Sequence, residues 1–323
     1  MTGVPLLVTG LPRSGTSWVG KMLEASNEVV YVNEPLNPRH PPGRSPGVLN
    51  ATVTHRFQYI CADNESGWAR AFEDTTALRY RLGAELRQNR SGYDLARMAK
   101  YLWAFTSGRV RGRRALLDDP FAVLATPWLV ERIGAVPVVL VRDPVALVGS
   151  WRKLGWTVRF HELLEQPLLV RDLLGPYVDE MRALVGSQDD VAKISLLWRA
   201  TYDIVDQARA RDPRIHVVRY EDLASSPLTA FRALYDHFGL TWCDAVSERI
   251  ETATSAKGGD NRSHVWSLRG GVSRTAFRPM DSKAALGSFR ERLSEEDIAR
   301  VRSLTADVAP RFYEASATGA APG

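Results

Sequence analysis

A stretch near the start of the chain decides the fold: Leu6-Leu7-Val8-Thr9-Gly10-Leu11-Pro12-Arg13-Ser14-Gly15-Thr16-Ser17-Trp18. Its apolar run predicts a buried strand, and the turn containing glycine and proline leads into a helical pattern over 15–25. A helix N-terminus presents free N–H groups and the positive end of the helix dipole, so this unit predicts an anion site. An ordinary strand-to-helix turn is the alternative.

The turn has the glycine spacing of a phosphate-binding loop, G-x-x-x-x-G-K-[S/T], without its lysine. Gly10 and Gly15 keep the spacing, Thr16 stands in the lysine position, and the basic residue is Arg13, inside the loop. In such loops the lysine contacts the terminal phosphates and the hydroxyl binds Mg²⁺. The substitution therefore predicts an anion other than a metal-bound triphosphate, and no metal site.

Short apolar runs alternate with longer helical patterns, which is typical of βαβ units and a parallel sheet. Strands are expected at 5–9, 29–32, 115–117, 136–141 and 215–219, and helices at 15–25, 94–106, 121–132, 144–153, 168–185, 190–211, 227–238 and 294–304. This order predicts an α/β fold: one domain over 1–314, with a central parallel sheet flanked by helices. We expect a disordered tail at 315–323.

A long segment, 37–113, separates the second and third expected strands and is rich in aromatic residues between Phe57 and Trp103. Insertions of this length in compact chains usually carry function, so a substrate lid is one interpretation. An extra helical layer that buries the aromatic side chains is the other.

Charge and cysteine content limit the function classes. The net charge is +5, with 36 arginines among 42 basic residues, a bias typical of high-GC bacterial coding. Because the arginines are dispersed, nucleic-acid binding is not expected. Cys61 and Cys243 form neither a disulfide framework nor a metal-binding spacing. The chain lacks an apolar run of about 18 residues and a signal-peptide pattern, so we expect a cytoplasmic protein without a membrane span.

A second basic position follows the fourth expected strand, where an apolar run ends at Arg142-Asp143-Pro144. Proteins that hydrolyse nucleoside triphosphates use an acidic residue to organise Mg²⁺, whereas this strand ends on Arg142. Ser150 lies on the following helix, six residues after Pro144, which is about 9 Å along the helix axis at 1.5 Å per residue. An arginine fork with a hydroxyl suits a phosphate monoester. The alternative is a structural network in which Arg142 pairs with Asp143 or Glu221.

Together these sites resemble those of bacterial sulfotransferases that use PAPS (3′-phosphoadenosine 5′-phosphosulfate). The family's 5′-phosphosulfate loop is similar to seven consecutive residues: Pro12, Arg13, Ser14, Gly15, Thr16, Ser17 and Trp18. Its 3′-phosphate site is similar to Arg142 and Ser150. The same resemblance implies that Tyr220 contacts the nucleotide and that Lys283 closes over the 3′-phosphate, with Arg269 as a competing candidate.

The resemblance implies a metal-independent transfer of a sulfuryl group from PAPS to an acceptor hydroxyl on a carbohydrate, a lipid-linked compound or a natural product. It assigns charge stabilisation to Arg13 and the general base to Glu34, which follows the second strand. His40 and His55 are alternative bases. A small-molecule kinase that uses ATP is the alternative function. The sequence indicates neither the acceptor's identity nor the oligomeric state.

Two acidic residues, Asp118 and Asp119, follow the third strand, where phenol and steroid sulfotransferases carry a histidine. Two roles are open for them. Asp119 orients the acceptor, or both residues cap the helix that starts at Phe121.

Overall fold

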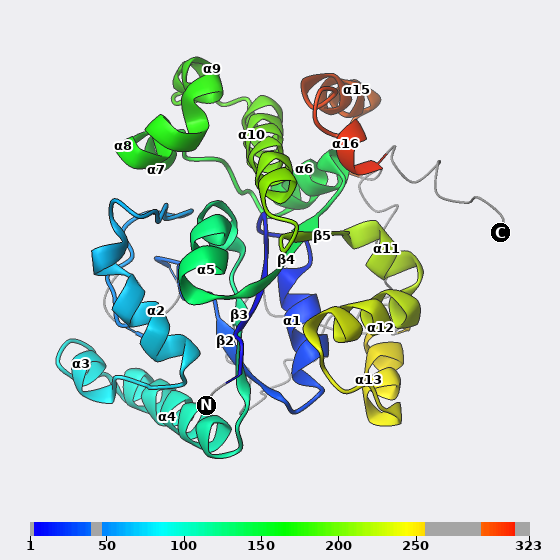
Figure 1. Ribbon diagram of the computed structural model, residues 1–323. Helices are drawn as coiled ribbons and strands as arrows, with labels where there is room; N and C mark the ends of the chain where they lie inside the picture. The colour runs from blue at the N-terminus through cyan, green and yellow to red at the C-terminus, as the bar shows by residue number, and fades with distance from the viewer. Residues whose placement is uncertain (1–2, 40–46, 256–291, 314–323) are drawn as a thin grey trace.

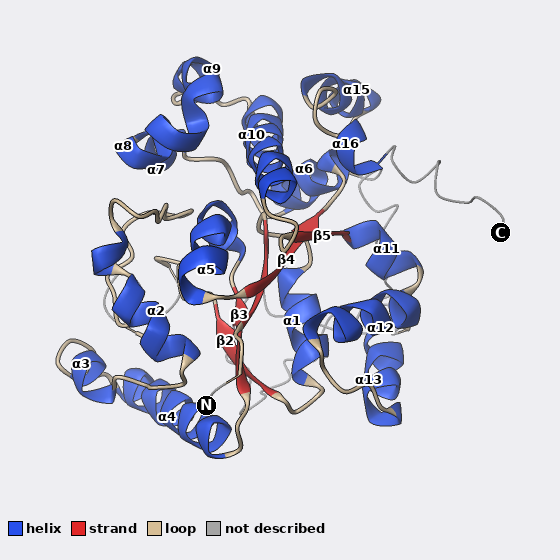
Figure 2. Ribbon diagram, viewed as in Figure 1, coloured by secondary structure: helices blue, strands red, loops and turns tan. Residues whose placement is uncertain are grey.

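Five parallel strands form one sheet in a computed structural model, which describes residues 3–39, 47–255 and 292–313. The sheet order is β2-β3-β1-β4-β5 (Figure 2). The strands are β1 (Leu6–Gly10), β2 (Val29–Asn33), β3 (Arg114–Asp118), β4 (Val136–Val141) and β5 (His216–Arg219). The predicted α/β fold with a central parallel sheet is confirmed, and each expected strand is found within one residue of its predicted bounds.

Both faces of the central strands are buried. Every residue of β1 is buried, and successive side chains enter opposite layers: Leu6 and Val8 join one hydrophobic cluster and Leu7 joins another. The register pairs Val8 with Asp118 and with Val138. The carboxyl ends of β1, β3 and β4 therefore lie along one edge of the sheet.

Three helices cover one face of the sheet: α1 (Thr16–Glu24), α12 (Pro227–Phe238) and α13 (Asp244–Thr254) (Figure 1). Trp18 of α1 packs edge-on against Phe231 of α12, with ring centroids 5.2 Å apart. A short helix, α11 (Tyr220–Ser225), connects β5 to α12. This packing fixes the position of α1, whose N-terminus directly follows the loop after β1.

The opposite face is covered in two parts. Over β4 lie α6 (Pro144–Lys153), α10 (Asp190–Arg211) and α15 (Glu295–Leu304), with the shorter helices α7 (Phe160–Leu164), α8 (Pro167–Leu169), α9 (Val178–Leu184) and α16 (Pro310–Tyr313) around them. Over β2 and β3 lie α2 (Ala69–Thr76), α4 (Gly92–Val110) and α5 (Thr126–Ile133), with α3 (Leu82–Leu86) ahead of α4. None of the helices in the described ranges combines the length and apolar character needed to cross a bilayer.

The helix predicted over 168–185 is wrong as a single element. The structure breaks it into α8, a π turn over Val170–Leu174, a 3₁₀ turn over Gly175–Tyr177, and α9. Pro176 lies at the break, where its missing N–H group interrupts the helical hydrogen bonds. Helices of one or two turns, such as α3 and α7, were not predicted because they carry too little periodicity.

The aromatic segment forms a packed helical layer beside β2. Within its described part, Phe72 and Phe105 are buried in the cluster against β2 and β3, whereas Tyr93 and Trp103 are exposed. The expected tail at 315–323 lies outside the described residues.

The order in which the chain adds strands to the sheet indicates where a ligand binds. From β1 the chain proceeds to β2 at one edge of the sheet, and from β4 it proceeds to β5 at the other edge. Open α/β sheets bind ligands outside the carboxyl ends of strands where the winding direction changes. In this sheet that position lies between β1 and β4.

Candidate active site

The loop after β1 leaves main-chain donors available at the start of α1. Gly15, with φ of 98°, is the N-cap residue, and no side chain in the described ranges caps the helix. The first N–H groups of a helix have no partner within it, so Thr16 and Ser17 present theirs toward the loop. Gly10 lies against β4 so closely that a Cβ would be 2.3 Å from the Leu140 oxygen. The positive end of α1 therefore faces any anion held by the loop.

Core hydrogen bonds fix the loop from beneath. Ser14 is fully buried, and its hydroxyl lies 3.1 Å from the hydroxyl of Tyr202, which donates to the Leu140 oxygen at 2.8 Å. Trp151 Nε1 donates to the Pro12 oxygen at 2.8 Å. The Ser14 hydroxyl thus faces the core and not the open side of the loop.

Arg13 joins the two predicted anion sites. It is exposed and has φ of 78°, a left-handed conformation that is uncommon outside glycine. Its Nε donates to Ser150 Oγ at 3.2 Å, and its main-chain oxygen accepts from Arg142 Nη1 at 2.8 Å. Desolvation and the positive charge of Arg142 lower the pKa of Arg13. The structure therefore places both predicted sites side by side.

Arg142 is buried and forms no ion pair with a carboxylate in the described ranges. Its guanidinium lies 4.4 Å from the ring centroid of Tyr220, and its Nε has no hydrogen-bond partner among the described residues. Glu221 accepts instead from the main-chain N–H of Asp143, at 3.0 Å. In the described part of the chain, the structural ion pair considered as an alternative does not form.

Tyr220 forms the wall between the loop and α11. It follows β5 directly and is buried. A Cβ added to Gly15 would lie 2.8 Å from its Cδ2, and Trp18 packs against it edge-on with centroids 5.8 Å apart. Gly15 is therefore required for this close approach as well as for its backbone conformation.

Glu34 lies just beyond β2, at the same edge as the loop. Its main-chain N–H donates to the Asp118 oxygen at 2.8 Å, and its φ of 46° is again left-handed. Its carboxylate accepts from Asn37 Nδ2 at 2.5 Å. Burial raises the pKa of Glu34 above its ordinary value, although the Asn37 hydrogen bond opposes the shift. A carboxyl group with a raised pKa at a ligand edge is a candidate general base.

Asp118 connects the Glu34 region to the loop, a link the sequence did not reveal. It is fully buried at the end of β3 and accepts hydrogen bonds from the hydroxyls of Tyr31 and Thr16. Its Oδ1 has no partner in the described ranges. Burial raises the pKa of Asp118 to about 7, and the charge of Glu34 adds to the shift. The protonation state of Asp118 therefore affects its hydrogen bond with Thr16, at the start of α1, and its charge interaction with Glu34.

Asp119 has the capping role. Its Oδ1 accepts from the Phe121 N–H at 2.9 Å and its Oδ2 from the Leu36 N–H at 2.5 Å. Asp119 is thus the N-cap residue of the 3₁₀ turn over Pro120–Ala125 and holds the segment that follows Glu34. Asp118 accepts hydrogen bonds from Tyr31 and Thr16 instead. The prediction that both residues cap the helix at Phe121 is therefore wrong for Asp118.

The remaining candidates are less well placed. His55 lies beside Thr54 and Glu165, with its Nε2 3.7 Å from a Glu165 carboxylate oxygen. His40, Arg269 and Lys283 lie outside the described residues. Arg292, which sequence reasoning missed, is close enough for its charge to lower the pKa of Arg13. No group of three or more His, Cys, Asp or Glu side chains in the described ranges is arranged to hold a metal ion.

The family follows from a comparison with known proteins. A model of the sulfotransferase family matches residues 5–244, a span that includes all five strands, Glu34 and both anion-binding regions. The chain belongs to the sulfotransferase family. This confirms the resemblance drawn from the two loop motifs. No curated protein sequence matches the chain significantly.

Several solved structures, including sulfotransferases, are similar to the chain at low sequence identity. The sulfotransferase domain from the curacin biosynthetic pathway has 13% identity and a TM-score of 0.47, covering 95% of this chain and 98% of its own. Sulfotransferase STF9 from Mycobacterium avium has 15% identity and a TM-score of 0.44, covering 97% and 78%. Retinol dehydratase, solved with retinol and PAP, has 11% identity and a TM-score of 0.37, covering 100% and 85%.

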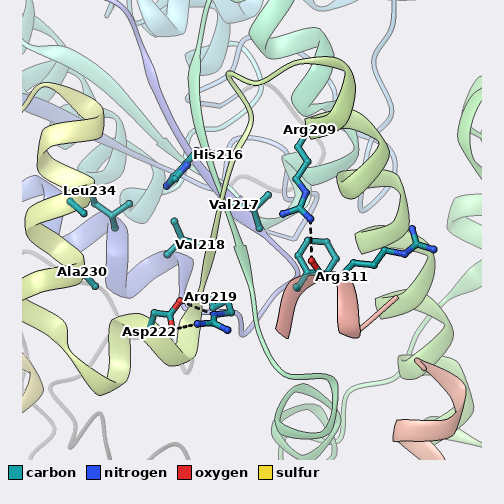
Figure 3. Close-up of a pocket in the computed structure, with 11 residues that line it drawn as sticks. Arg209, His216, Val217, Val218, Arg219, Asp222, Ala230, Leu234 and Arg311 are labelled. Carbon is teal, nitrogen blue, oxygen red and sulfur yellow. Dashed lines mark hydrogen bonds and ion pairs between the residues drawn. The ribbon is translucent and has the colours of Figure 1, made fainter. Parts of the chain in front are cut away.

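A cavity of about 390 Å³ lies away from the candidate site of this family member, beside β5 (Figure 3). Arg219 and Asp222 form an ion pair at its rim, with a closest distance of 2.7 Å, and Arg209 donates to the Arg311 oxygen at 3.2 Å. Neither Arg13 nor Arg142 lines it. This cavity is therefore separate from the anion-binding edge.

Proposed function

We propose that the protein transfers a sulfuryl group from PAPS to an acceptor hydroxyl, without a metal, on a carbohydrate, a lipid-linked compound or a natural product. The observation that carries the proposal is the pair Arg13 and Arg142 at one loop: Arg142 donates to the main-chain oxygen of Arg13 at 2.8 Å, and neither arginine forms an ion pair within the described residues. The two positive charges repel each other, since the charge of Arg142 contributes to the lowered pKa of Arg13, so their arrangement suits a ligand with more than one anionic group. PAPS has a phosphosulfate at one end of its ribose and a phosphate at the other.

The buried donors fit this cofactor. Arg142 Nε lies buried without a partner in the described part of the chain, at a position where an orphaned charged donor is costly. An accepting phosphate satisfies it, and Ser150 adds a hydroxyl beside it. We assign Arg142 and Ser150 to the 3′-phosphate, with Tyr220 beside the nucleotide. Lys283 remains a prediction for the same phosphate.

The loop fits the phosphosulfate end. We assign to it Arg13 and the main-chain N–H groups of Thr16 and Ser17 at the start of α1, within the predicted loop from Pro12 to Trp18. Preorganised donors at a helix N-terminus stabilise charge that develops on a leaving group without reorganising. An arginine side chain keeps its proton in proteins, so Arg13 acts through its charge and not as a proton donor. The Ser14 hydroxyl is engaged by Tyr202, so Ser14 contributes to this site through the shape of the loop.

Glu34 is the proposed general base. When bound, PAPS supplies the activated sulfuryl group, and the acceptor hydroxyl must lose its proton to attack it. Glu34 lies at the same sheet edge as the loop, and burial raises its pKa toward the range where a carboxylate accepts a proton effectively. Its Asn37 hydrogen bond orients the carboxylate. His40 and His55 remain alternatives. The substrate role of 37–113, a cytoplasmic location and the absence of a nucleic-acid partner stay predictions.

Ligand binding separates this function from a kinase. We expect saturable binding of adenosine 3′,5′-bisphosphate in the presence of EDTA, measured by isothermal titration calorimetry, and sulfate transfer from ³⁵S-labelled PAPS across an acceptor panel. Protection against thermal unfolding by ATP with Mg²⁺, but not by the bisphosphate, would favour the ATP-dependent kinase instead.

A further inference from the structure

The outward face of α4 is apolar although nothing in the described ranges covers it. The helix packs on β2 through Phe105 and Gly108, and Met98 is also buried. On the opposite side six exposed residues follow helical spacing within an arc of about 100°: Leu95, Ala99, Leu102, Trp103, Thr106 and Val110. Trp103 is 72% exposed and Val110 is 82% exposed. We call these six residues the outer stripe.

The outer stripe is unusual for the molecule as a whole. Of the nine large hydrophobic residues that are exposed in the described ranges, four belong to it: Leu95, Leu102, Trp103 and Val110. Single exposed apolar side chains are normal, but a contiguous row along one helix marks an interaction surface. In Figure 1, α4 lies at the periphery of the molecule, so the stripe is accessible.

Positive charge surrounds the stripe. Positions 87–113 carry one acidic residue, Asp94, and seven basic residues, a net charge of +6 against +5 for the whole chain: Arg87, Arg90, Arg97, Lys100, Arg109, Arg111 and Arg113. Arg97 is buried and forms ion pairs with Asp94 and with the buried Glu85, which lies just ahead of this segment, so its charge is compensated. Away from this buried group, two arginines precede the helix and three lie at or after its C-terminal end, and none of the five forms an ion pair in the described ranges: Arg87, Arg90, Arg109, Arg111 and Arg113.

A basic depression adjoins the stripe. Its volume is about 580 Å³, and Arg79, Arg81 and Arg109 line it together with Leu102 and Val110. The first two arginines share one buried carboxylate, Asp74, with closest distances of 3.5 and 2.6 Å. Arg109 has no ion pair in the described part of the chain. The depression therefore carries excess positive charge beside apolar side chains.

We propose that α4 docks the protein onto an anionic lipid surface, with the outer stripe entering the interface and the surrounding arginines holding headgroup phosphates. Apolar and aromatic side chains on one face with Lys and Arg beside them are what interfacial helices use. With 19 residues, α4 is about 28 Å long. The helix lies along the bilayer surface and does not cross it.

Charge rules out the simplest alternative occupant. In a two-fold dimer through α4 the same patch meets itself, so two segments of net charge +6 would be apposed. The partner must therefore be anionic. The outer stripe contains no acidic side chain for specific pairing with another protein, which favours a lipid surface. Beyond Val110 the chain leads into the first residue of β3, so the C-terminal end of the outer stripe lies toward the amino ends of the strands.

Vesicle binding tests the proposal with the full chain. We expect the protein to float with vesicles of phosphatidylglycerol and phosphatidylcholine, to lose that binding in high salt, and not to float with phosphatidylcholine alone. Trp103→Ser combined with Val110→Ser should weaken binding at least 10-fold, and Arg109→Ala about 5-fold. Leu228→Ser and Arg182→Ala, on α12 and α9, are matched controls that should leave binding unchanged.

Two further measurements keep the outcome decisive if a variant is unstable. Brominated lipids should quench tryptophan fluorescence in the wild type, and the quenching should fall in Trp103→Phe. All variants should retain bisphosphate binding, which reports folding. The proposal is overturned if the protein does not float, if phosphatidylcholine alone suffices, or if the α4 variants bind vesicles normally. It is equally overturned if α4 variants dissociate a dimer in sedimentation, or if soluble polyglutamate binds α4 and vesicles do not.

Discussion

Arg13 Nε donates a hydrogen bond to Ser150 Oγ across 3.2 Å, and this contact bridges a loop and a helix that are far apart in the sequence. Because Arg142 also donates to the Arg13 main-chain oxygen, the three residues form one unit. An anion that binds one of these residues therefore also changes the electrostatic environment of the other two.

The first prediction concerns coupling between Arg13 and Ser150. Residues in direct contact give non-additive effects of about 0.5–3 kcal/mol. We expect Arg13→Ala and Ser150→Ala each to weaken binding of adenosine 3′,5′-bisphosphate, and the double variant to lose less than the sum of the two in free energy. Calorimetric titration of all four proteins measures this. Ser195→Ala, which removes a buried hydroxyl without a partner in the described ranges, is the control; strictly additive losses would argue against the unit.

Arg142 should discriminate between nucleotides. Hydrogen bonds to charged groups contribute about 1.5–3 kcal/mol, so Arg142→Ala should weaken bisphosphate binding roughly 10- to 150-fold. Adenosine 5′-monophosphate, which lacks the 3′-phosphate, should be affected much less. Arg152→Ala on α6, where an exposed arginine pairs with Asp297, should change neither affinity. Equal losses for both nucleotides would remove Arg142 from the 3′-phosphate site.

Local patterns predicted the strands and the two anion-binding loops because both depend on neighbouring residues. The apolar runs that became β1 and β4 are buried throughout or nearly so, and Gly10 and Gly15 stand where the turn demands glycine. The contact between Arg13 and Ser150 depends on the order of strands in the sheet, which no local pattern encodes. The sequence therefore predicted two separate anion sites, whereas the structure joins them through Arg13 and Ser150.

The strained backbone at two residues and the buried hydrogen bonds could not be predicted from the sequence either. Arg13 and Glu34 both have positive φ, a conformation that tertiary contacts impose on residues other than glycine. Ser14 is engaged by Tyr202, 188 positions away, and Asp118 by Tyr31, 87 positions away. Such partners are selected by the packing of the sheet and its helices, so the roles of Ser14 and Asp118 became visible only in three dimensions.

Gly15 should be intolerant of a side chain. Its φ of 98° strains any other residue, and a Cβ would lie 2.8 Å from Tyr220. We expect Gly15→Ala to weaken bisphosphate binding at least 10-fold and to lower the melting temperature by several degrees. Gly112 also has positive φ but nothing within 4 Å of the added Cβ, so Gly112→Ala should cost about 1 kcal/mol and leave binding intact. Similar binding by both variants would contradict the close approach.

Asp118 should make stability depend on pH. Its folded pKa of about 7 lies above its ordinary value, so its contribution to stability is complete below about pH 4 and is lost as pH rises through 7. Asp118→Asn stays neutral at every pH. From pH 5 to pH 8 the free energy of unfolding should therefore shift in favour of the variant by about 2–3 kcal/mol relative to wild type.

Urea unfolding across that pH range measures the difference between the two proteins. Asp179→Asn, which removes a carboxyl whose side chain is 97% exposed, should track wild type at each pH. A constant difference between Asp118→Asn and wild type from pH 5 to 8 would show that Asp118 does not titrate there.

Glu34 should control turnover and its dependence on pH, without controlling cofactor affinity. General-base catalysis is worth about 10²- to 10⁴-fold, so Glu34→Gln should lose that much in kcat while binding adenosine 3′,5′-bisphosphate within about two-fold of wild type. Only the carboxylate accepts a proton. Burial raises the pKa of Glu34, so wild-type kcat/KM should fall as pH drops through a value above the ordinary 4.5, and this acidic limb should vanish in Glu34→Gln. Glu24→Gln, at an exposed ion pair with Lys21, should preserve both rate and limb. An acidic limb that persists in Glu34→Gln would assign the base to another residue, for which His55 is the first described candidate.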